Sequence, residues 1–273
     1  MEIRCSDSVA RMLRRMGVVS FSLLCLTLVN CAHVPEEPSR LVAVGDVHGA
    51  YGAFTDILQE AHLIDGALQW IGGNATLVQV GDVTDRGPQV KPVLDLLMAL
   101  EGQAVEQGGQ VLTLMGNHDA YNLMGHYDYH STPLPVFTKI WSDFADADSE
   151  SRREAAYRQY ETWQSRFPPC APQSRTEWLD AHPPGALEYQ EALGPTGKYG
   201  IWLRRLPAVV RIGGILFVHG GVSPEVIKAR HAMPVEVNRR LKAEIESYDQ
   251  ARRDLLEGGI ILPFSTREEI ECA

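Results

Sequence analysis

The hydrophobic positions of the chain form short runs that each end in a polar cluster. Three of them are LVAVGDVHG (41–49), TLVQVGDVTDRG (76–87) and VLTLMGNHD (111–119). Each apolar run has the length of a buried strand, and the first two are rich in valine. The stretches between them, 53–64 and 89–107, have the spacing of amphipathic helices. The alternation of strand and helix predicts a parallel sheet whose connections are crossover helices.

The pattern loosens in the second half of the chain. Residues 130–197 contain several prolines and a charged segment, 148–167, that predicts a helix. We expect this region to be an insert or cap of helices and loops beside the site. The stretch PAVVRIGGILFVHGG (207–221) predicts a hairpin that turns at its first pair of glycines. A helix is predicted over 235–259.

The first forty residues have a different composition. Arg11, Arg14 and Arg15 precede the apolar run VVSFSLLCLTLV (18–29), which is about twelve residues long. A membrane-spanning helix needs roughly 20 residues, so this run fits the hydrophobic part of a signal peptide. We expect residues 1–31 to be a signal peptide, 32–40 a linker and 41–273 the folded domain.

Export of the chain follows from that expectation. Cys31 resembles the lipid-modified cysteine of bacterial lipoproteins, so we expect a periplasmic protein or one anchored to the membrane through Cys31. A secreted protein without lipid and a protein with an uncleaved anchor are the alternatives.

The overall charge excludes one class of partner. The chain has 35 acidic and 25 basic residues and a net charge of −10. Proteins that bind nucleic acid hold its phosphates with clusters of lysine and arginine, and the sequence contains no long block of positive charge. We therefore expect no nucleic acid as a partner.

The polar clusters place acidic, amide and imidazole side chains at the carboxyl ends of predicted strands, where α/β proteins bind ligands. These residues are Asp46, His48, Asp82, Asn117, His118 and His219. Any one of them alone fits a turn or a helix cap, but four clusters at strand ends favour a metal site. Oxygen and imidazole ligands suit Mn, Fe or Zn. Asp82, on the central strand, is placed to bridge two ions roughly 3.5–4 Å apart.

The motifs GDVHG, GDVTDRG, GNHD and VHGG, in this order, resemble the signature blocks of the calcineurin-like metallophosphatases. The DRG of the second motif resembles the phosphoprotein phosphatase superfamily. LVQVGDVTDRGP, DLLMALE and NLMG resemble its bacterial, Shewanella-like branch. The resemblance covers roughly residues 40–265. It implies an α/β fold, a metallophosphatase-type sandwich of β-sheets flanked by helices.

The resemblance also implies two divalent metal ions, with Mn favoured over Fe or Zn. The residues that would hold the first ion are Asp46, His48 and Asp82, and those that would hold the second are Asp82, Asn117 and His219. His118 matches the general acid, Asp85 the carboxylate that orients it, and Arg86 an arginine that grips the phosphate. The implied reaction is hydrolysis of a phosphorylated protein or a small phosphoester by a metal-activated hydroxide.

The sequence departs from the family pattern at two points. Asp119 stands where the Shewanella-like branch more often has glutamate, and its motif GNHD keeps a dinucleoside polyphosphate hydrolase as an alternative. The family also has a histidine ligand well after the HGG motif, whereas only His231 follows His219 here. We therefore expect the C-terminal strands and that ligand to be missing. Three interpretations remain open. The sequence could be a truncated form of an active enzyme, or the protein could hold its second metal weakly or with help from His126 or His130. It could also be a degenerate protein without catalytic activity.

Overall fold

The computed structural model describes residues 40–126, 134–166, 173–224, 228, 233–267 and 270. The expected signal peptide, Cys31 and the expected linker up to residue 39 lie outside these ranges, as do His130 and His231, so the expectations about them stay predictions. Within the described ranges, no helix combines the length and the apolar character that crossing a membrane requires.

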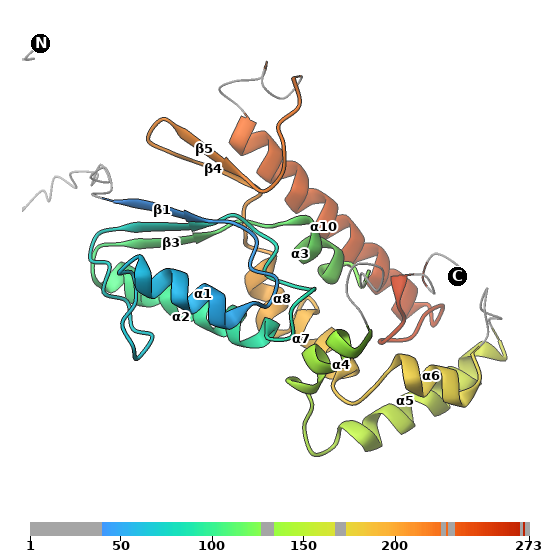
Figure 1. Cartoon of the computed structure of the whole chain (residues 1–273). Coiled ribbons are helices and arrows are strands. Elements are labelled where there is room, and N and C mark those ends of the chain that lie inside the picture. The colour runs from blue at the N-terminus through green and yellow to red at the C-terminus, as the bar shows by residue number, and fades with distance from the viewer. Residues whose placement is uncertain are drawn as a thin grey trace, which may run out of the picture. The chain divides into compact units, whose positions relative to one another are not determined.

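The first half of the described chain folds as a parallel sheet with crossover helices. Strands β1 (Leu41–Val44), β2 (Thr76–Gln79) and β3 (Gln110–Thr113) pair in that order, with β2 in the centre. Helices α1 (Tyr51–Glu60) and α2 (Val90–Glu106) connect successive strands and lie next to each other on one face of the sheet (Figure 1). The predicted alternation of strands and helices and the α/β class are confirmed.

The core explains why the strand ends are level with one another. In α2, Val93, Leu97, Leu100 and Ala104 recur at helical spacing and are fully buried. Every residue of β2 is buried, as expected for a central parallel strand. The strands pair in register, with Val44 opposite Gln79 and Gln79 opposite Thr113, so their ends are level. The loops after β1, β2 and β3 therefore begin at the same edge of the sheet.

The middle of the chain is built from helices and loops. These helices are α3 (Asn117–Leu123), α4 (Leu134–Ser142), α5 (Ser149–Gln164), α6 (Arg175–Ala181), α7 (Ala186–Leu193) and α8 (Lys198–Leu203). Helices α4, α7 and α8 contribute Trp141, Tyr189 and Trp202 to the same core as α1 and α2. A second core cluster surrounds Trp178 and contains side chains of α5 and α6. Part of the region expected to be an insert thus shares the main core.

A hairpin and a long helix complete the described fold. Strands β4 (Val209–Ile212) and β5 (Ile215–Val218) pair antiparallel, and their turn is the predicted glycine pair. Helix α10 (Met233–Glu257) packs on β4, where the Asn238 amide bonds to the backbone of Ala208 and Val209. The backbone N–H of Met115, just after β3, donates to the carbonyl of Pro207 at 2.9 Å. This bond ties the hairpin to the end of the parallel sheet.

Candidate metal and catalytic site

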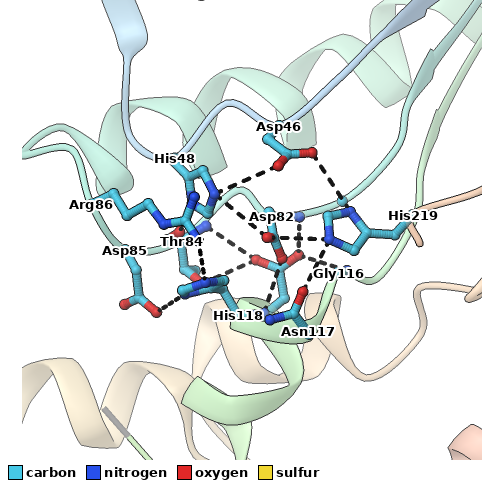
Figure 2. Close-up of polar contacts among 12 residues, drawn as sticks. Asp46, His48, Asp82, Thr84, Asp85, Arg86, Gly116, Asn117, His118 and His219 are labelled. Atoms are coloured by element: carbon cyan, nitrogen blue, oxygen red, sulfur yellow. Dashed lines mark hydrogen bonds and ion pairs between the residues drawn. The ribbon is translucent and has the colours of Figure 1, made fainter. Parts of the chain in front are cut away.

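Four loops, one after each of β1, β2, β3 and β5, bring the predicted site residues together (Figure 2). Backbone hydrogen bonds join the first two loops. The N–H groups of Val47 and His48 donate to the carbonyl of Asp82 at 3.1 and 2.9 Å, and that of Gly49 donates to Val83 at 3.0 Å. The backbone, rather than flexible side chains, therefore sets how far His48 lies from Asp82.

The backbone at the site is strained at four positions that are not glycine. His48, Asp82, Asp85 and Arg86 have φ angles of 45°, 55°, 66° and 61°. The left-handed conformation costs such residues roughly 1–2 kcal/mol each. Strain of this kind persists only where the surroundings enforce it, and it is concentrated at functional sites. Four such residues in two neighbouring loops indicate that the fold enforces a backbone conformation that directs these side chains toward the site.

Gly116 allows the start of α3 to approach the loop after β2. A Cβ atom at this position would lie 2.1 Å from Oδ1 of Asp82 and 2.2 Å from its backbone nitrogen. No side chain fits into that space. The backbone N–H of His118, near the start of α3, then donates to Oδ1 of Asp82 at 2.9 Å. Any larger residue at 116 would push α3 away from Asp82.

The buried carboxylate of Asp119 also links the loop after β2 to the start of α3. Its Oδ1 accepts hydrogen bonds from the N–H groups of Val83 and Thr84 and from the Thr84 hydroxyl, at 3.0–3.1 Å. Its Oδ2 accepts from the N–H groups of Asp82 and Gly116 at 2.9 and 3.0 Å. The carboxyl is fully buried, and burial raises its pKa, while the hydrogen bonds oppose that rise. In the sequence Asp119 is recognisable only as a departure from the family pattern, because these contacts join segments more than 30 positions apart.

The carboxylate of Asp82 lies between two histidines. Its Oδ2 is 3.5 Å from Nε2 of His48 and 3.2 Å from Nε2 of His219. Asp46 lies beside the same pair, 3.8 Å from each ring (Figure 2). The amide oxygen of Asn117 is 3.1 Å from Nε2 of His219. The structure thus brings together every residue that was predicted to bind metal.

The donor set fits divalent cations. Nδ1 of His48 lies 2.8 Å from the carbonyl of Thr84, which can only accept, so the proton is on Nδ1 and the lone pair on Nε2. That Nε2 is buried and has no hydrogen-bond partner among the residues that the structure describes. His219 repeats the arrangement, with Nδ1 2.9 Å from the carbonyl of Val80. A backbone acceptor on one ring nitrogen is typical of metal-binding histidines. The Nε2 lone pairs converge with carboxylate oxygens, an arrangement that a cation stabilises.

The acidic and imidazole side chains of the site form two overlapping groups. Among the described residues, two groups of three possible ligands occur, His48–Asp82–His118 and Asp46–Asp82–His219, each with its ligand atoms within 4.8 Å. Both contain Asp82, in agreement with a bridging position. Asp46 is grouped with His219 instead of His48, although it lies equally near both rings. His126 belongs to neither group and lies against Tyr121, with ring centroids 5.4 Å apart.

The three predicted catalytic residues lie next to the candidate metal ligands. Nδ1 of His118 is 2.7 Å from Oδ2 of Asp85, which is fully buried. The hydrogen bond that Nδ1–H of His118 donates to the Asp85 carboxylate raises the pKa of His118, although burial of the imidazole opposes the shift. Nη2 of Arg86 is 3.0 Å from Nε2 of His118. The contact with Asp85 therefore increases the proton affinity of the His118 imidazole, and the guanidinium of Arg86 lies beside Nε2 of the same ring.

Asn122 is a further site residue to which the sequence analysis gave no role. Its buried Nδ2 donates to Oδ2 of Asp85 and to the carbonyl of His118, both at 2.9 Å. Asn122 follows His118 by one helical turn, a spacing that places the two on one face of α3. This spacing is the signal in the sequence that could have identified it.

Comparisons with known proteins agree with this geometry. The family model for calcineurin-like phosphoesterases matches residues 39–261. Shewanella-like protein phosphatase 2 of Arabidopsis thaliana is 31% identical over 196 residues, which are 71% of this chain and 49% of the relative. Shewanella-like protein phosphatase 1 of Plasmodium berghei (strain Anka) is 27% identical over 228 residues, 81% of this chain and 51% of the relative.

A solved structure shows the same arrangement of elements. The cold-active protein-tyrosine phosphatase of a psychrophilic Shewanella species superimposes with a TM-score of 0.52 at 26% identity. The match covers 75% of this chain and 48% of that protein. The chain therefore spans about half the length of the relatives that it matches.

Proposed function

The chain belongs to the calcineurin-like phosphoesterase family, and on this basis we propose that it hydrolyses phosphomonoesters with two divalent metal ions. The observation that carries the proposal is the position of Asp82, whose Oδ2 lies within 3.5 Å of both His48 and His219. The His118–Asp85 pair and Arg86 lie directly beside it. The residues proposed as metal ligands, general acid and phosphate-binding cation thus lie in one place.

The metal ions and the side chains would divide the work of the reaction. Divalent ions held by the metal-binding residues would activate a water molecule and offset the charge of the phosphate. Arg86 would bind phosphate oxygens through its planar guanidinium. His118 would give a proton from Nε2 to the departing oxygen, and Asp85 would stabilise the imidazolium that carries this proton. The side chains of Asp85, Arg86 and His118 lie together in one cluster of polar contacts (Figure 2).

Binding of a phosphate would also prepare His118 for its role. Nη2 of Arg86 lies 3.0 Å from Nε2 of His118, the nitrogen that would carry the proton. A phosphate dianion is a stronger acceptor for the guanidinium than a neutral imidazole is. Its arrival would draw Arg86 away, leaving Nε2 free to take up a proton.

We further propose a phosphorylated protein as substrate and Mn²⁺ as the metal. The similarity to proteins named protein phosphatases and a protein-tyrosine phosphatase supports the first point, and the oxygen and imidazole ligands support the second. A dinucleoside polyphosphate hydrolase is not favoured, because the relatives that match most of the chain are protein phosphatases by name.

Export and lipid anchoring through Cys31 remain proposals that rest on residues 1–31 alone. Cell fractionation with a Cys31→Ser variant tests them. The variant should move from the membrane fraction to the soluble exported fraction. An unchanged distribution would contradict the anchoring.

Hydrolysis of p-nitrophenyl phosphate tests the proposed activity. We expect turnover by the purified protein with added Mn²⁺, and its loss with a chelator or in Asp82→Asn. Glu154→Gln is the control, because it removes a surface carboxylate that pairs only with Arg175 among the ion pairs described. Absence of turnover from folded, Mn²⁺-supplied protein would contradict the proposal, and so would full activity of Asp82→Asn.

A further inference from the structure

We propose that Tyr189 and Asn122 are positioning residues that connect helix α7 to the His118–Asp85 pair. The inference rests on the proposed function, since it concerns the residue that would protonate the leaving group. Tyr189 is separated from Asn122 by 67 positions in the sequence. It belongs to the helical middle region of the chain, not to any of the loops that carry the metal ligands.

A continuous chain of hydrogen bonds leads from α7 to the imidazole. The hydroxyl of Tyr189 donates to Oδ1 of Asn122 at 2.7 Å. Nδ2 of Asn122 donates to Oδ2 of Asp85 at 2.9 Å, and that oxygen accepts the Nδ1–H of His118 at 2.7 Å. All four residues are at most 3% exposed. Water therefore cannot readily replace a lost member of the chain.

The tyrosine hydroxyl determines which way the amide of Asn122 points. Because the hydroxyl donates to Oδ1, Nδ2 faces Oδ2 of Asp85. The opposite rotamer would place Oδ1 against the carboxylate, where two acceptors repel each other. Nδ2 also lies within donating distance of the carbonyl of His118 and the hydroxyl of Thr84. The correctly oriented amide thus holds both the carboxylate and the backbone of the candidate acid.

Close packing alone does not fix this amide. Asn122 lines a cavity of about 500 Å³, which also borders Leu187 and Gln190 of α7. The oxygen and the NH2 group of an amide are nearly the same size, so packing cannot distinguish them and the orientation depends on hydrogen bonds. Tyr189, in contrast, is held firmly: its ring is fully buried and packs edge-on against Phe144 with ring centroids 4.9 Å apart. The hydroxyl of Tyr189 is therefore held in place as the hydrogen-bond donor to Oδ1 of Asn122.

Removal of the hydroxyl should act on proton donation more than on binding. Without it, Oδ1 of Asn122 is a buried acceptor that loses this donor, and the amide loses the contact that sets its rotamer. Asp85 would then lose an oriented donor and hold His118 less well. Hydrolysis of an ester with a poor leaving group needs this proton, whereas p-nitrophenolate leaves more readily without it.

The test compares Tyr189→Phe with the unchanged protein on two substrates in the presence of Mn²⁺. We expect kcat to fall about 10-fold for phenyl phosphate and much less for p-nitrophenyl phosphate, with KM unchanged for both. Tyr199→Phe is the matched control, because Tyr199 is also buried and bonds through its hydroxyl to a carboxylate, Asp95. It should leave the ratio of the two rates unchanged. An equal decrease for both substrates in Tyr189→Phe would overturn the inference.

Two further measurements separate this inference from the proposed function. In an Asn122→Ala background, Tyr189→Phe should have no additional effect, and an additive effect would contradict action through Asn122. The downfield proton resonance of the His118 Nδ1–H reports the Asp85 contact without any turnover. It should shift or broaden in Tyr189→Phe and not in Tyr199→Phe. If the unchanged protein hydrolyses neither substrate, the proposed function fails, and this resonance alone decides: an unchanged signal overturns the inference.

Discussion

Asp82 is the residue on which the candidate site depends most. Its Oδ2 lies between His48 and His219, and its Oδ1 accepts the backbone N–H of His118. Its backbone has a φ of 55°, and its neighbours hold it in that conformation. One side chain therefore links the metal ligands to the helix that carries the candidate acid.

Asp119 should be essential for the stability of this arrangement. In Asp119→Asn, an amide N–H₂ would replace one of two oxygens that accept buried N–H groups. Each buried donor left without an acceptor costs about 1–3 kcal/mol, so we expect the free energy of unfolding to fall by about 3 kcal/mol. Urea denaturation measures this change.

A surface carboxylate provides the control for Asp119. Asp65 accepts the N–H groups of Ala67 and Gln69 through Oδ1 in an exposed turn, where water can replace it. We expect Asp65→Asn to lower the free energy of unfolding by less than about 1 kcal/mol. Equal losses in the two variants would show that the buried contacts of Asp119 have no special importance.

His118 should matter most where the leaving group is poor. Asp85 raises the pKa of His118, which increases the fraction of imidazolium available near neutral pH. Loss of a general acid typically costs 10²–10⁴-fold, so His118→Asn should lower kcat for phenyl phosphate by about 100-fold or more. Steady-state kinetics measures the loss. If p-nitrophenyl phosphate hydrolysis fell by the same factor, a role in proton donation would be contradicted.

At the scale of elements, the sequence predicts the parts of the fold whose signal is local. Strands β1 to β3, helices α1 and α2 and the hairpin follow from apolar periodicity and glycine position, and the structure confirms them. The candidate ligands after β1, β2 and β3 could be predicted because these parallel strands end at one edge of their sheet, whereas His219 follows a strand of the separate hairpin and was found through its VHGG motif. Tyr189 could not, because its contact with Asn122 joins positions 67 apart and depends on how α7 packs. The shared core of α4, α7 and α8 is likewise a tertiary effect without a local signal.

The end of helix α6 should make stability depend on pH. His182 stacks on Trp178 with ring centroids 4.0 Å apart, and its Nδ1–H donates to the carbonyl of Trp178. Burial lowers the pKa of His182 from 6.5 to about 4, and the nearby Arg153 acts in the same direction. Between pH 4 and pH 6.5, His182 is protonated in the unfolded chain and neutral in the folded chain. Stability should therefore fall as pH decreases from 6.5 toward 4, by a total on the order of 3 kcal/mol.

Replacement of His182 by phenylalanine isolates this effect. His182→Phe keeps an aromatic ring against Trp178 but removes the titrating group. Urea denaturation between about pH 7 and pH 5 should show a smaller loss of stability in the variant than in the unchanged protein. The same pH dependence in both proteins would show that His182 does not contribute to it.

At the scale of the whole molecule, the candidate site joins segments that are far apart in the sequence. His219 follows the hairpin and contacts Asn117, 102 positions earlier. The chain spans about half the length of its relatives. Ions bound between the parallel sheet and the hairpin would connect these segments directly.

Metal binding should therefore stabilise the whole fold. A ligand at 100 times its dissociation constant adds about 2.7 kcal/mol to the free energy of unfolding if it binds only the folded state. We expect Mn²⁺ to raise the melting temperature of the protein, and a chelator to reverse the rise. Asp82→Asn should abolish most of this response, while Glu154→Gln should retain it. Equal responses in both variants would place the stabilising ion elsewhere.

The central claim is that Asp82 lies between two bound metal ions. Anomalous diffraction from crystals grown with Mn²⁺ tests it most directly. If two metal ions bind as proposed, we expect two anomalous peaks roughly 3.5–4 Å apart. One should lie beside His48 and the other beside His219, and Asp82 should contact both. A single peak, or peaks that do not contact Asp82, would contradict it.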